Sequence, residues 1–556
     1  MTKTAVYEAL ADTFVAEGVD TFFALMGDGN MHFCTALKNR PGVSMFHSRH
    51  EHAAVAMAMA YNSATGKVGV ASTTCGPGFT QIMTALATAA RGRVPLVVFA
   101  GEAPIGAKWY HQFIEQAPLA LATGTHYISA HAPKRMHIHV REAFHIARYE
   151  RRPVVIGVPY DVQKEAMPDI GAYAPSSTVV PQLDRLPPSP EKIDALVKKL
   201  IAAKAPVILA GKGVVKSGAR KEVEELAERT GAILSNTLLA RGLFDHNPFS
   251  INVSGGFARM VSRDVGAKAD FVLSIGASMT YWTTDGGDMY RNAEIAQIDI
   301  EPLGLRHGAK VADIYLRADA KLSAQAMLDK LGAKPKTAAT IRTPELADRI
   351  RDEPVDATNY NIEPGVLDPR EVCAELDKVL DKDYDTICGS GHQSFFHTTM
   401  RGWDADKYHI MRDFGAIGSG LSYTVGVAAA RQNGKVVIFE GDGSVLMHIQ
   451  ELETLQRHGL KCLIIVFNDG AYGSEIHKLR QEGIDDSGAI FGRPDFAGIA
   501  RGFGLRGETI TDVADFPRLF EEYKAGKQAM IWDVPISDKV VTPRMRTTLQ
   551  KGHGVM

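Results

Sequence analysis

The sequence has 556 residues, too many for one ordinary hydrophobic core, and this length predicts about three or four domains. Hydrophobic residues make up 45% and charged residues 23%, values typical of a globular rather than a disordered protein. The formal net charge of −2 gives no electrostatic reason to expect nucleic acid or an anionic membrane as a partner.

Targeting and redox signals are also absent from the sequence. No apolar signal-peptide region follows Met1, and no apolar run is long enough to cross a bilayer. The cysteines contain no Cys-x-x-Cys pair: Cys34, Cys75, Cys373, Cys388 and Cys462. We therefore expect a reduced, cytoplasmic protein without structural disulfides or a zinc site.

Short apolar runs alternate with helix-like patterns in three segments, which is typical of parallel α/β sheets. Proline-marked connections near 168–190 and 335–369 separate these segments. We expect three doubly wound parallel-sheet domains, over residues 1–165, 190–335 and 365–556. The clearest expected strands are 69–71, 96–100, 154–158, 207–210, 271–275, 295–300, 386–388, 436–439 and 462–467.

Acidic residues follow two of the expected strands in the third segment. Gly441-Asp442-Gly443-Ser444 comes after the run 436–439, and Asn468-Asp469-Gly470-Ala471 comes after the run 462–467. Carboxyl ends of adjacent parallel strands meet at one sheet edge, where α/β folds bind ligands. Two carboxylates and a carbonyl suit Mg²⁺, and the glycines let backbone amides approach a phosphate. The alternative is a pair of ordinary strand-to-helix turns.

This pattern resembles the cofactor motif of thiamine-diphosphate-dependent enzymes, in which two such motifs lie 469 − 442 = 27 positions apart. The resemblance implies that Asp442, Asp469 and the carbonyl of Ala471 bind Mg²⁺. If the register is one residue off, Asn468 and Gly470 take these roles. The diphosphate would lie against Gly441, Gly443, Ser444 and Tyr472.

The first segment resembles the pyrimidine-binding domain of acetolactate-synthase-like enzymes in Arg49 to Ala54 and in Cys75-Gly76-Pro77-Gly78. The resemblance implies that Glu51 hydrogen-bonds the cofactor pyrimidine and promotes the tautomer that removes the thiazolium proton. Gly76 and Pro77 would also contact the cofactor. Alternatively, Glu51 is a helix-terminal residue in contact with Arg49 or His52.

Two further stretches of the third segment resemble cofactor contacts of the same family. Gly415 to Leu421 resembles the loop that keeps the cofactor bent, with Ile417 between its rings and Gly415 on the pyrimidine. Gly391-His392-Gln393 resembles a second diphosphate contact. Ile417 as a core residue and His392 as a loop histidine are the alternatives.

The resemblance also bears on assembly and on a second cofactor. In the resembled family, the residues matching Glu51 and the metal motif meet across a subunit boundary, which implies a homodimer or homotetramer. Some relatives hold FAD or ADP in the central domain. We expect no FAD here, since Ile275 to Thr280 replaces their Arg-Phe-Asp-Asp-Arg run.

Several residues are candidates for substrate selection. Gly27-Asp28-Gly29-Asn30 resembles a decarboxylase motif whose Asp lines the active site, and Glu475 falls where those enzymes carry an acidic proton donor. Gln112 and Gln116 are candidates to bind a substrate oxygen, with helix capping as the alternative. His32, Cys75 and His111 are further candidate pocket residues.

Three functions remain open at this point. The first is a lyase or decarboxylase acting on a small carbonyl substrate, a 2-oxo acid or an α-hydroxyketone, with linked carboligation. The second is an acetolactate-synthase-type transferase. The third is a catalytically inactive, cofactor-binding regulatory protein, against which the presence of both Glu51 and the metal motif argues.

Overall fold

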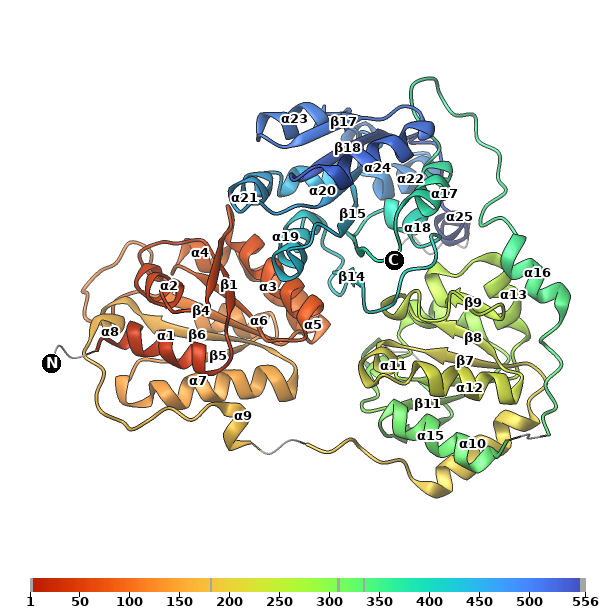
Figure 1. Ribbon diagram of the computed structural model, residues 1–556, viewed down its shortest axis with the longest axis horizontal. Helices are drawn as coiled ribbons and strands as arrows, with labels where there is room; N and C mark the ends of the chain where they lie inside the picture. Colours follow the sequence, from red (N-terminus) through yellow and green to blue (C-terminus); the bar gives the residue numbers. More distant parts are fainter. Residues whose placement is uncertain (1–3, 181–182, 308–310, 334–335, 551–556) are drawn as a thin grey trace.

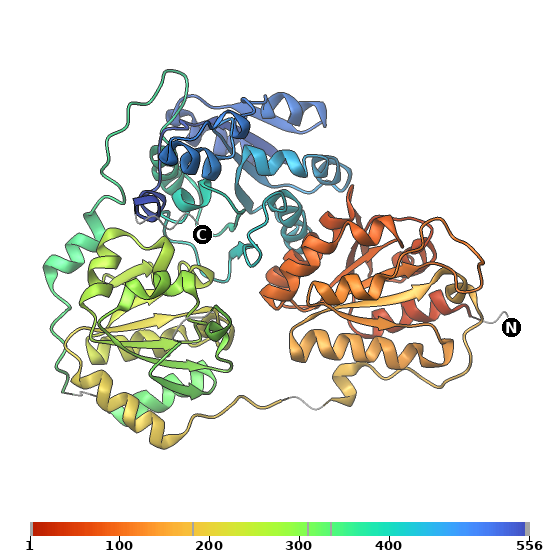
Figure 2. The same cartoon turned by 180° about the vertical axis from the view of Figure 1, so that it is seen from behind.

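The computed structural model describes residues 4–180, 183–307, 311–333 and 336–550. The described chain forms three α/β lobes, each built on a six-stranded parallel sheet (Figure 1). Seen from behind, long extended segments connect the central lobe to the other two (Figure 2). In the part of the chain that is described, no helix is long and apolar enough to span a membrane.

The first lobe carries a sheet with the strand order β2-β1-β3-β4-β6-β5. Its strands are β1 (Thr21–Ala24), β2 (Ser44–His47), β3 (Gly69–Thr73), β4 (Leu96–Glu102), β5 (His126–Ser129) and β6 (Pro153–Pro159). Its helices are α1 (Val6–Ala16), α2 (Met31–Lys38), α3 (Glu51–Thr65), α4 (Pro77–Thr80), α5 (Met83–Gly92), α6 (Gln116–Ala122), α7 (Met136–His145) and α8 (Tyr160–Lys164), and α9 (Ser176–Val179) follows in the connection. Every residue of β6 is buried, because helices cover both faces of the sheet.

The central lobe has the order β12-β11-β10-β7-β8-β9. Its strands are β7 (Pro206–Ala210), β8 (Ile233–Asn236), β9 (Ser250–Val253), β10 (Phe271–Ile275), β11 (Glu294–Asp299) and β12 (Ile314–Arg317). Its helices are α10 (Pro190–Ala202), α11 (Lys212–Ser217), α12 (Arg220–Thr230), α13 (Met260–Lys268), α14 (Tyr281–Thr284) and α15 (Ala320–Leu331), and α16 (Pro344–Asp352) follows in the second connection. This is the strand order of a doubly wound nucleotide-binding-type sheet.

The third lobe has the order β14-β13-β15-β16-β18-β17, which repeats the order of the first lobe strand for strand. Its strands are β13 (Asp385–Cys388), β14 (Tyr408–Ile410), β15 (Val436–Gly441), β16 (Leu463–Asn468), β17 (Arg506–Thr509) and β18 (Met530–Pro535). Its helices are α17 (Pro369–Val379), α18 (Gln393–His397), α19 (Gly420–Arg431), α20 (Asp442–Met447), α21 (Glu451–Arg457), α22 (Gly473–Glu482), α23 (Phe496–Gly502), α24 (Phe516–Ala525) and α25 (Pro543–Gln550). The first and third lobes therefore share one topology.

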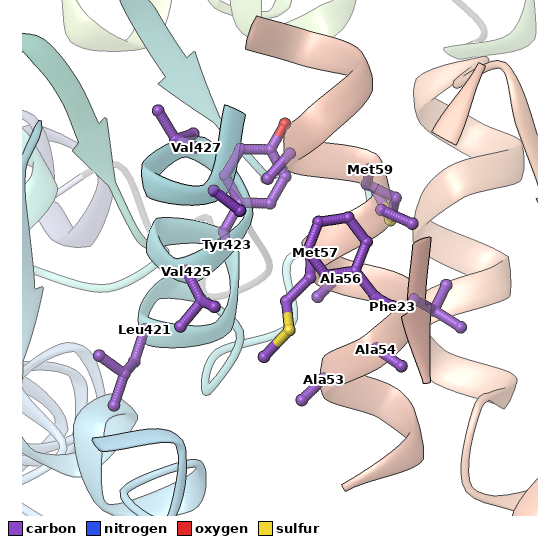
Figure 3. Close-up of a cluster of buried hydrophobic side chains, with 14 of the residues drawn as sticks. Phe23, Ala53, Ala54, Ala56, Met57, Met59, Leu421, Tyr423, Val425 and Val427 are labelled. Carbon is purple, nitrogen blue, oxygen red and sulfur yellow. The ribbon is translucent and has the colours of Figure 1, made fainter. Parts of the chain in front are cut away.

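Helices α3 and α19 join the first and third lobes through a shared apolar core (Figure 3). Side chains of Ala53 and Met57 face Leu421 and Val425 in this contact. A Cβ atom on Gly426 would lie 2.2 Å from the carbonyl oxygen of Met57, so the close approach requires glycine there. This packing places the start of α3 beside the loop that precedes α19.

Candidate cofactor site

Two aspartates meet at the carboxyl edge of the third sheet. Strands β15 and β16 are paired in parallel, and Asp442 and Asp469 follow them directly. The Asp442 carboxylate accepts hydrogen bonds from the backbone N–H groups of Gly443 and Gly470, both at 2.7 Å. Asp469 accepts one from Ala471 N at 3.2 Å. The 27-residue spacing thus brings both carboxylates to one point.

The electrostatics of this pair favour a cation. Burial raises the pKa of both carboxyl groups, and the negative charge of Asp469 raises the pKa of Asp442 further. Two adjacent buried carboxylates are unfavourable in a protein unless a positive charge compensates them. With the nearby carbonyl of Ala471, the oxygen donors fit a hard divalent cation such as Mg²⁺.

A cavity of about 490 Å³ opens beside the two aspartates. All third-lobe residues that the sequence marked as cofactor or metal contacts line it: Gly391, His392, Gln393, Gly415, Ile417, Gly441, Asp442, Gly443, Ser444, Asp469, Ala471 and Tyr472. Glu475 lies at its rim, where its carboxylate is 3.7 Å from Lys478 Nζ. Lys478, Ser474 and Ile536 also line the cavity, and no sequence motif marks them.

The loop before α19 is tied to the motif that carries Asp442. The hydroxyl oxygen of Ser444 accepts a hydrogen bond from Gly418 N at 2.7 Å. A Cβ atom on Gly418 would lie 2.9 Å from Met447 Cβ, and its φ of +95° disfavours any other residue. Ile417 is partly buried and lines the cavity rather than the core.

His392 is held in one tautomer at the cavity wall. Its Nε2 accepts a hydrogen bond from Thr542 N at 3.3 Å, and burial lowers the pKa of its imidazole well below the usual value. In a neutral ring whose Nε2 accepts, Nδ1 carries the proton. Nδ1–H is therefore available as a donor to an anion such as a phosphate.

Glu51 is not among the residues that line this cavity in one chain. It is the first residue of α3 and is partly buried. A Cβ atom on Gly78 would lie 3.2 Å from its Oε1, so the turn Cys75 to Gly78 passes close to the carboxylate. Among the described residues, none from the first lobe lines the cavity beside Asp442. Within one chain, Glu51 thus lies beside the turn that contains Gly76 and Pro77 and does not line the cavity next to the aspartate pair.

The two candidate glutamines of the first lobe have different hydrogen-bond partners. Gln116 is buried: it accepts from Gly76 N and donates to Gly101 O, both at 3.1 Å, so its amide supports the Gly76 turn. Gln112 instead accepts a hydrogen bond from the Cys75 thiol at 3.4 Å.

Tyr110 lies close to Cys75, the hydrogen-bond partner of Gln112. Burial and the neighbouring Cys75 and Asp28 raise the pKa of Tyr110 to about 12. Asp28 itself is exposed. Tyr110 was not among the residues expected from the sequence, although its place beside His111 and Gln112 was a signal.

Histidines fill the junction between α3 and the third lobe. His52 Nε2 is 2.8 Å from the Ser419 hydroxyl, and His448 Nδ1 is 2.7 Å from the Ser422 hydroxyl. The His52 and His448 rings are 4.9 Å apart. Burial lowers the pKa of His52 to about 4 and that of His448 to about 3.

We expect this junction to weaken in acid. Because His448 has a lower pKa in the folded state, its stabilising contribution is present above pH ~6.5 and is lost as the pH falls toward 3. The contribution of His448 to the free energy of unfolding should fall by about 2 kcal/mol between pH 7 and pH 5. Nearby Glu451, whose pKa burial raises to about 7, acts in the opposite direction.

Thermal unfolding of His448→Gln at pH 7 and pH 5 tests this expectation. The variant should lose less stability between the two pH values than the wild type, whereas exposed His111→Gln should match the wild type. An unchanged pH dependence in His448→Gln would refute the assignment.

Family models match all three lobes. The N-terminal TPP binding domain of thiamine pyrophosphate enzymes matches residues 4–119, the central domain matches 193–327, and the C-terminal TPP binding domain matches 389–534. The chain therefore belongs to the thiamine pyrophosphate enzyme family, whose cofactor is also called thiamine diphosphate.

Similar proteins point to one branch of this family. The chain is 30% identical over 530 residues to an acetolactate synthase large subunit of Parasynechococcus marenigrum (strain WH8102), covering 91% of this chain and 83% of that protein. It is 26% identical to the acetolactate synthase large subunit of Cyanidium caldarium, covering 93% and 91%. For the acetolactate synthase of Arthrospira platensis the identity is 27%, covering 95% and 93%. The protein is an acetolactate-synthase-like, thiamine-diphosphate-dependent enzyme of the carboligase and decarboxylase type.

Proposed function

We propose that the protein cleaves the carbon–carbon bond next to the carbonyl of a small 2-oxo acid or α-hydroxyketone and transfers the fragment to a proton or a second carbonyl. The pair of buried Asp442 and partly buried Asp469 beside a 490 Å³ cavity carries this proposal. When bound, thiamine diphosphate supplies a carbon nucleophile and then an electron sink for the cleaved bond.

The third lobe would hold the cofactor by its diphosphate. Asp442, Asp469 and the Ala471 carbonyl would hold Mg²⁺, whose positive charge would compensate both carboxylates and favour an anionic diphosphate nearby. Nδ1–H of His392 donates to a diphosphate oxygen, and Gly441, Gly443 and Ser444 lie along its path. Gly391, Gln393 and Tyr472 complete the wall of this cavity. Gly415 and Ile417 face the rest of the cofactor. We assign no role to FAD.

The site would be completed by a second copy of the chain, giving a homodimer or homotetramer. The first lobe exposes Trp109 by 77% and Phe113 by 64%, close in sequence to Gln112. Around the cavity, the third lobe exposes Tyr472 by 40% and Met447 by 52%. Burying these apolar side chains against each other would favour association and would bring Glu51 of one copy to the cavity of the other.

Glu51 would act on the cofactor, and other residues on the substrate. Glu51 holds a proton at the pyrimidine and, with Gly76 and Pro77, orients this ring. Asp28, Tyr110 and Gln112 would hydrogen-bond the substrate, and Glu475 at the rim would deliver a proton to the product. Gln116 would position the Gly76 turn. The five described cysteines are free and buried, which supports a reducing compartment such as the cytoplasm.

An acetolactate-synthase-type transfer is the second candidate, and the names of the similar proteins favour it. Incubation with pyruvate, thiamine diphosphate and Mg²⁺ separates the two. We expect carbon dioxide with acetaldehyde or acyloin as the main products. Acetolactate accumulating in step with pyruvate loss would replace the first candidate by the second. If a panel of 2-oxo acids and ketols gave no product and no cofactor-bound intermediate, the catalytic proposal would be wrong and an inactive regulatory protein would remain.

A further inference from the structure

A second cavity, of about 420 Å³, lies between the central and third lobes. Its walls come from the segment Gly255–Phe257 with the start of α13, from α17 and α18, and from residues 542–544. In the described part of the chain it shares no lining residue with the cofactor cavity. Its volume is in the range of pockets for small organic ligands.

One of the cations that line this cavity has no salt bridge within the described chain. Arg370 is paired with Asp368 at 2.6 Å, Lys378 with Glu375 at 2.5 Å, and Arg544 with Asp285. The two lining carboxylates have basic partners of their own, since Asp356 pairs with Arg546 at 2.7 Å and Asp377 pairs with Lys382 at 2.6 Å.

Arg259 is the exception among the lining cations of the described chain. Its terminal nitrogens donate to the carbonyl oxygens of Ile350 at 3.1 Å and Glu353 at 2.6 Å, and no carboxylate is paired with it. Burial and the positive charge of Arg401 lower the pKa of this guanidinium, and the negative charge of Glu353 offsets this only in part. An anion in the cavity would relieve this unfavourable environment.

The remaining walls are apolar. The Phe257 and Phe395 rings stack across the two lobes, with centroids 4.4 Å apart and planes inclined by 15°. Met260 and Met400 also line the cavity, and Met260 is 51% exposed. Methionine and aromatic side chains form adaptable surfaces for apolar ligands. The cavity therefore combines an apolar body with one cationic point.

The two cavities are close neighbours. Helix α18 begins at the cofactor cavity with Gln393 and presents Phe395 and Phe396 to the second cavity. Thr542 lines the second cavity, and its N–H donates to His392, which lines the first. A ligand of the second cavity would thus lie one helix away from the expected diphosphate.

We propose that this interlobe cavity is a second ligand site, distinct from the cofactor site, that binds an amphipathic organic anion. Its acidic group is held by Arg259, and its apolar body lies between Phe257 and Met400. Because no lining residue is shared, thiamine diphosphate and this ligand bind at the same time.

Fluorescence titration with 8-anilinonaphthalene-1-sulfonate, an apolar anion, tests the site in the full-length enzyme saturated with thiamine diphosphate and Mg²⁺. Arg259→Gln removes the charge, and Ala374→Trp fills the cavity from the exposed side of α17 without changing charge. Each should weaken probe binding by about tenfold or more. Arg518→Gln and Ala525→Trp, at exposed positions of α24, serve as controls and should leave it unchanged.

Three outcomes would overturn the proposal. Wild-type affinity in both cavity variants would show that the probe binds elsewhere. Loss of binding in Ala374→Trp but not in Arg259→Gln would show an apolar site that does not select anions. Displacement of the probe by thiamine diphosphate would place it in the cofactor cavity. If Arg259→Gln does not fold, two measurements still test the proposal. Weaker probe binding in Ala374→Trp, without displacement by thiamine diphosphate, shows that the probe occupies this cavity. Weaker binding of a neutral anilinonaphthalene than of the sulfonate shows that the cavity prefers an anion.

Discussion

Replacing Glu51 by Gln is expected to lower turnover by about 10²- to 10⁴-fold, the range for loss of a positioned acid–base group. The side chain keeps its size and hydrogen-bonding capacity but no longer exchanges a proton with the pyrimidine. Since the residues expected to hold the metal and the diphosphate all belong to the third lobe, the affinity for thiamine diphosphate should change little. Steady-state kinetics and a cofactor titration on the same preparation measure both quantities.

Glu191→Gln is a matched control for this substitution. Glu191 also lies in the first turn of a helix, α10, but is exposed on the central lobe. It should retain wild-type turnover. Unchanged turnover in Glu51→Gln would remove Glu51 from catalysis, whereas a parallel loss of cofactor affinity would make it a binding residue.

The sequence predicted the buried strands of this fold better than its edges. Runs such as Leu96 to Ala100 and Leu463 to Phe467 lie in β4 and β16, which are buried on both faces and are therefore continuously apolar. Strand β17 has the sequence Arg506-Gly507-Glu508-Thr509, and its last two residues are exposed, so no apolar pattern marks it. The order of the strands in each sheet also cannot be predicted from a local sequence pattern, because contacts between distant segments determine it.

The site was predictable to the extent that local motifs determine it. Asp442 and Asp469 converge because each follows a strand, and these two strands are neighbours in the sheet. The tautomer of His392 depends on Thr542, 150 positions away in sequence, which no motif reveals. Tyr110 and Lys478 likewise enter through tertiary contacts. The cofactor role of Glu51 stays a prediction, since Glu51 does not line the cavity of its own chain.

Asp442→Asn is expected to abolish tight binding of Mg²⁺ and thiamine diphosphate, weakening it by about 100-fold or more because a buried charged ligand is lost. The fold itself should survive. The amide oxygen still accepts one backbone hydrogen bond, and removing one of two adjacent buried charges offsets the loss of the other bond.

Thermal unfolding with and without the cofactor measures this prediction. Ligand at about 100 times its dissociation constant stabilises the wild type by about 2.7 kcal/mol, and this increment should vanish in Asp442→Asn. Exposed Asp352→Asn is the control and should keep the increment. A normal cofactor-induced rise in Tm for Asp442→Asn would show that the aspartate pair does not bind the metal.

The two inactive variants together decide whether the site is shared between chains. In a mixed dimer of Glu51→Gln and Asp442→Asn, one site combines both substitutions, and the other combines the intact Glu51 of one copy with the intact Asp442 of its partner. Random reassembly should therefore restore roughly a quarter of wild-type activity from two inactive preparations. If Glu51 instead reached the cavity of its own chain, every site would carry one substitution and mixing would restore nothing. Among the described residues of one chain, none of the first lobe lines the third-lobe cavity, which is why we expect the first result.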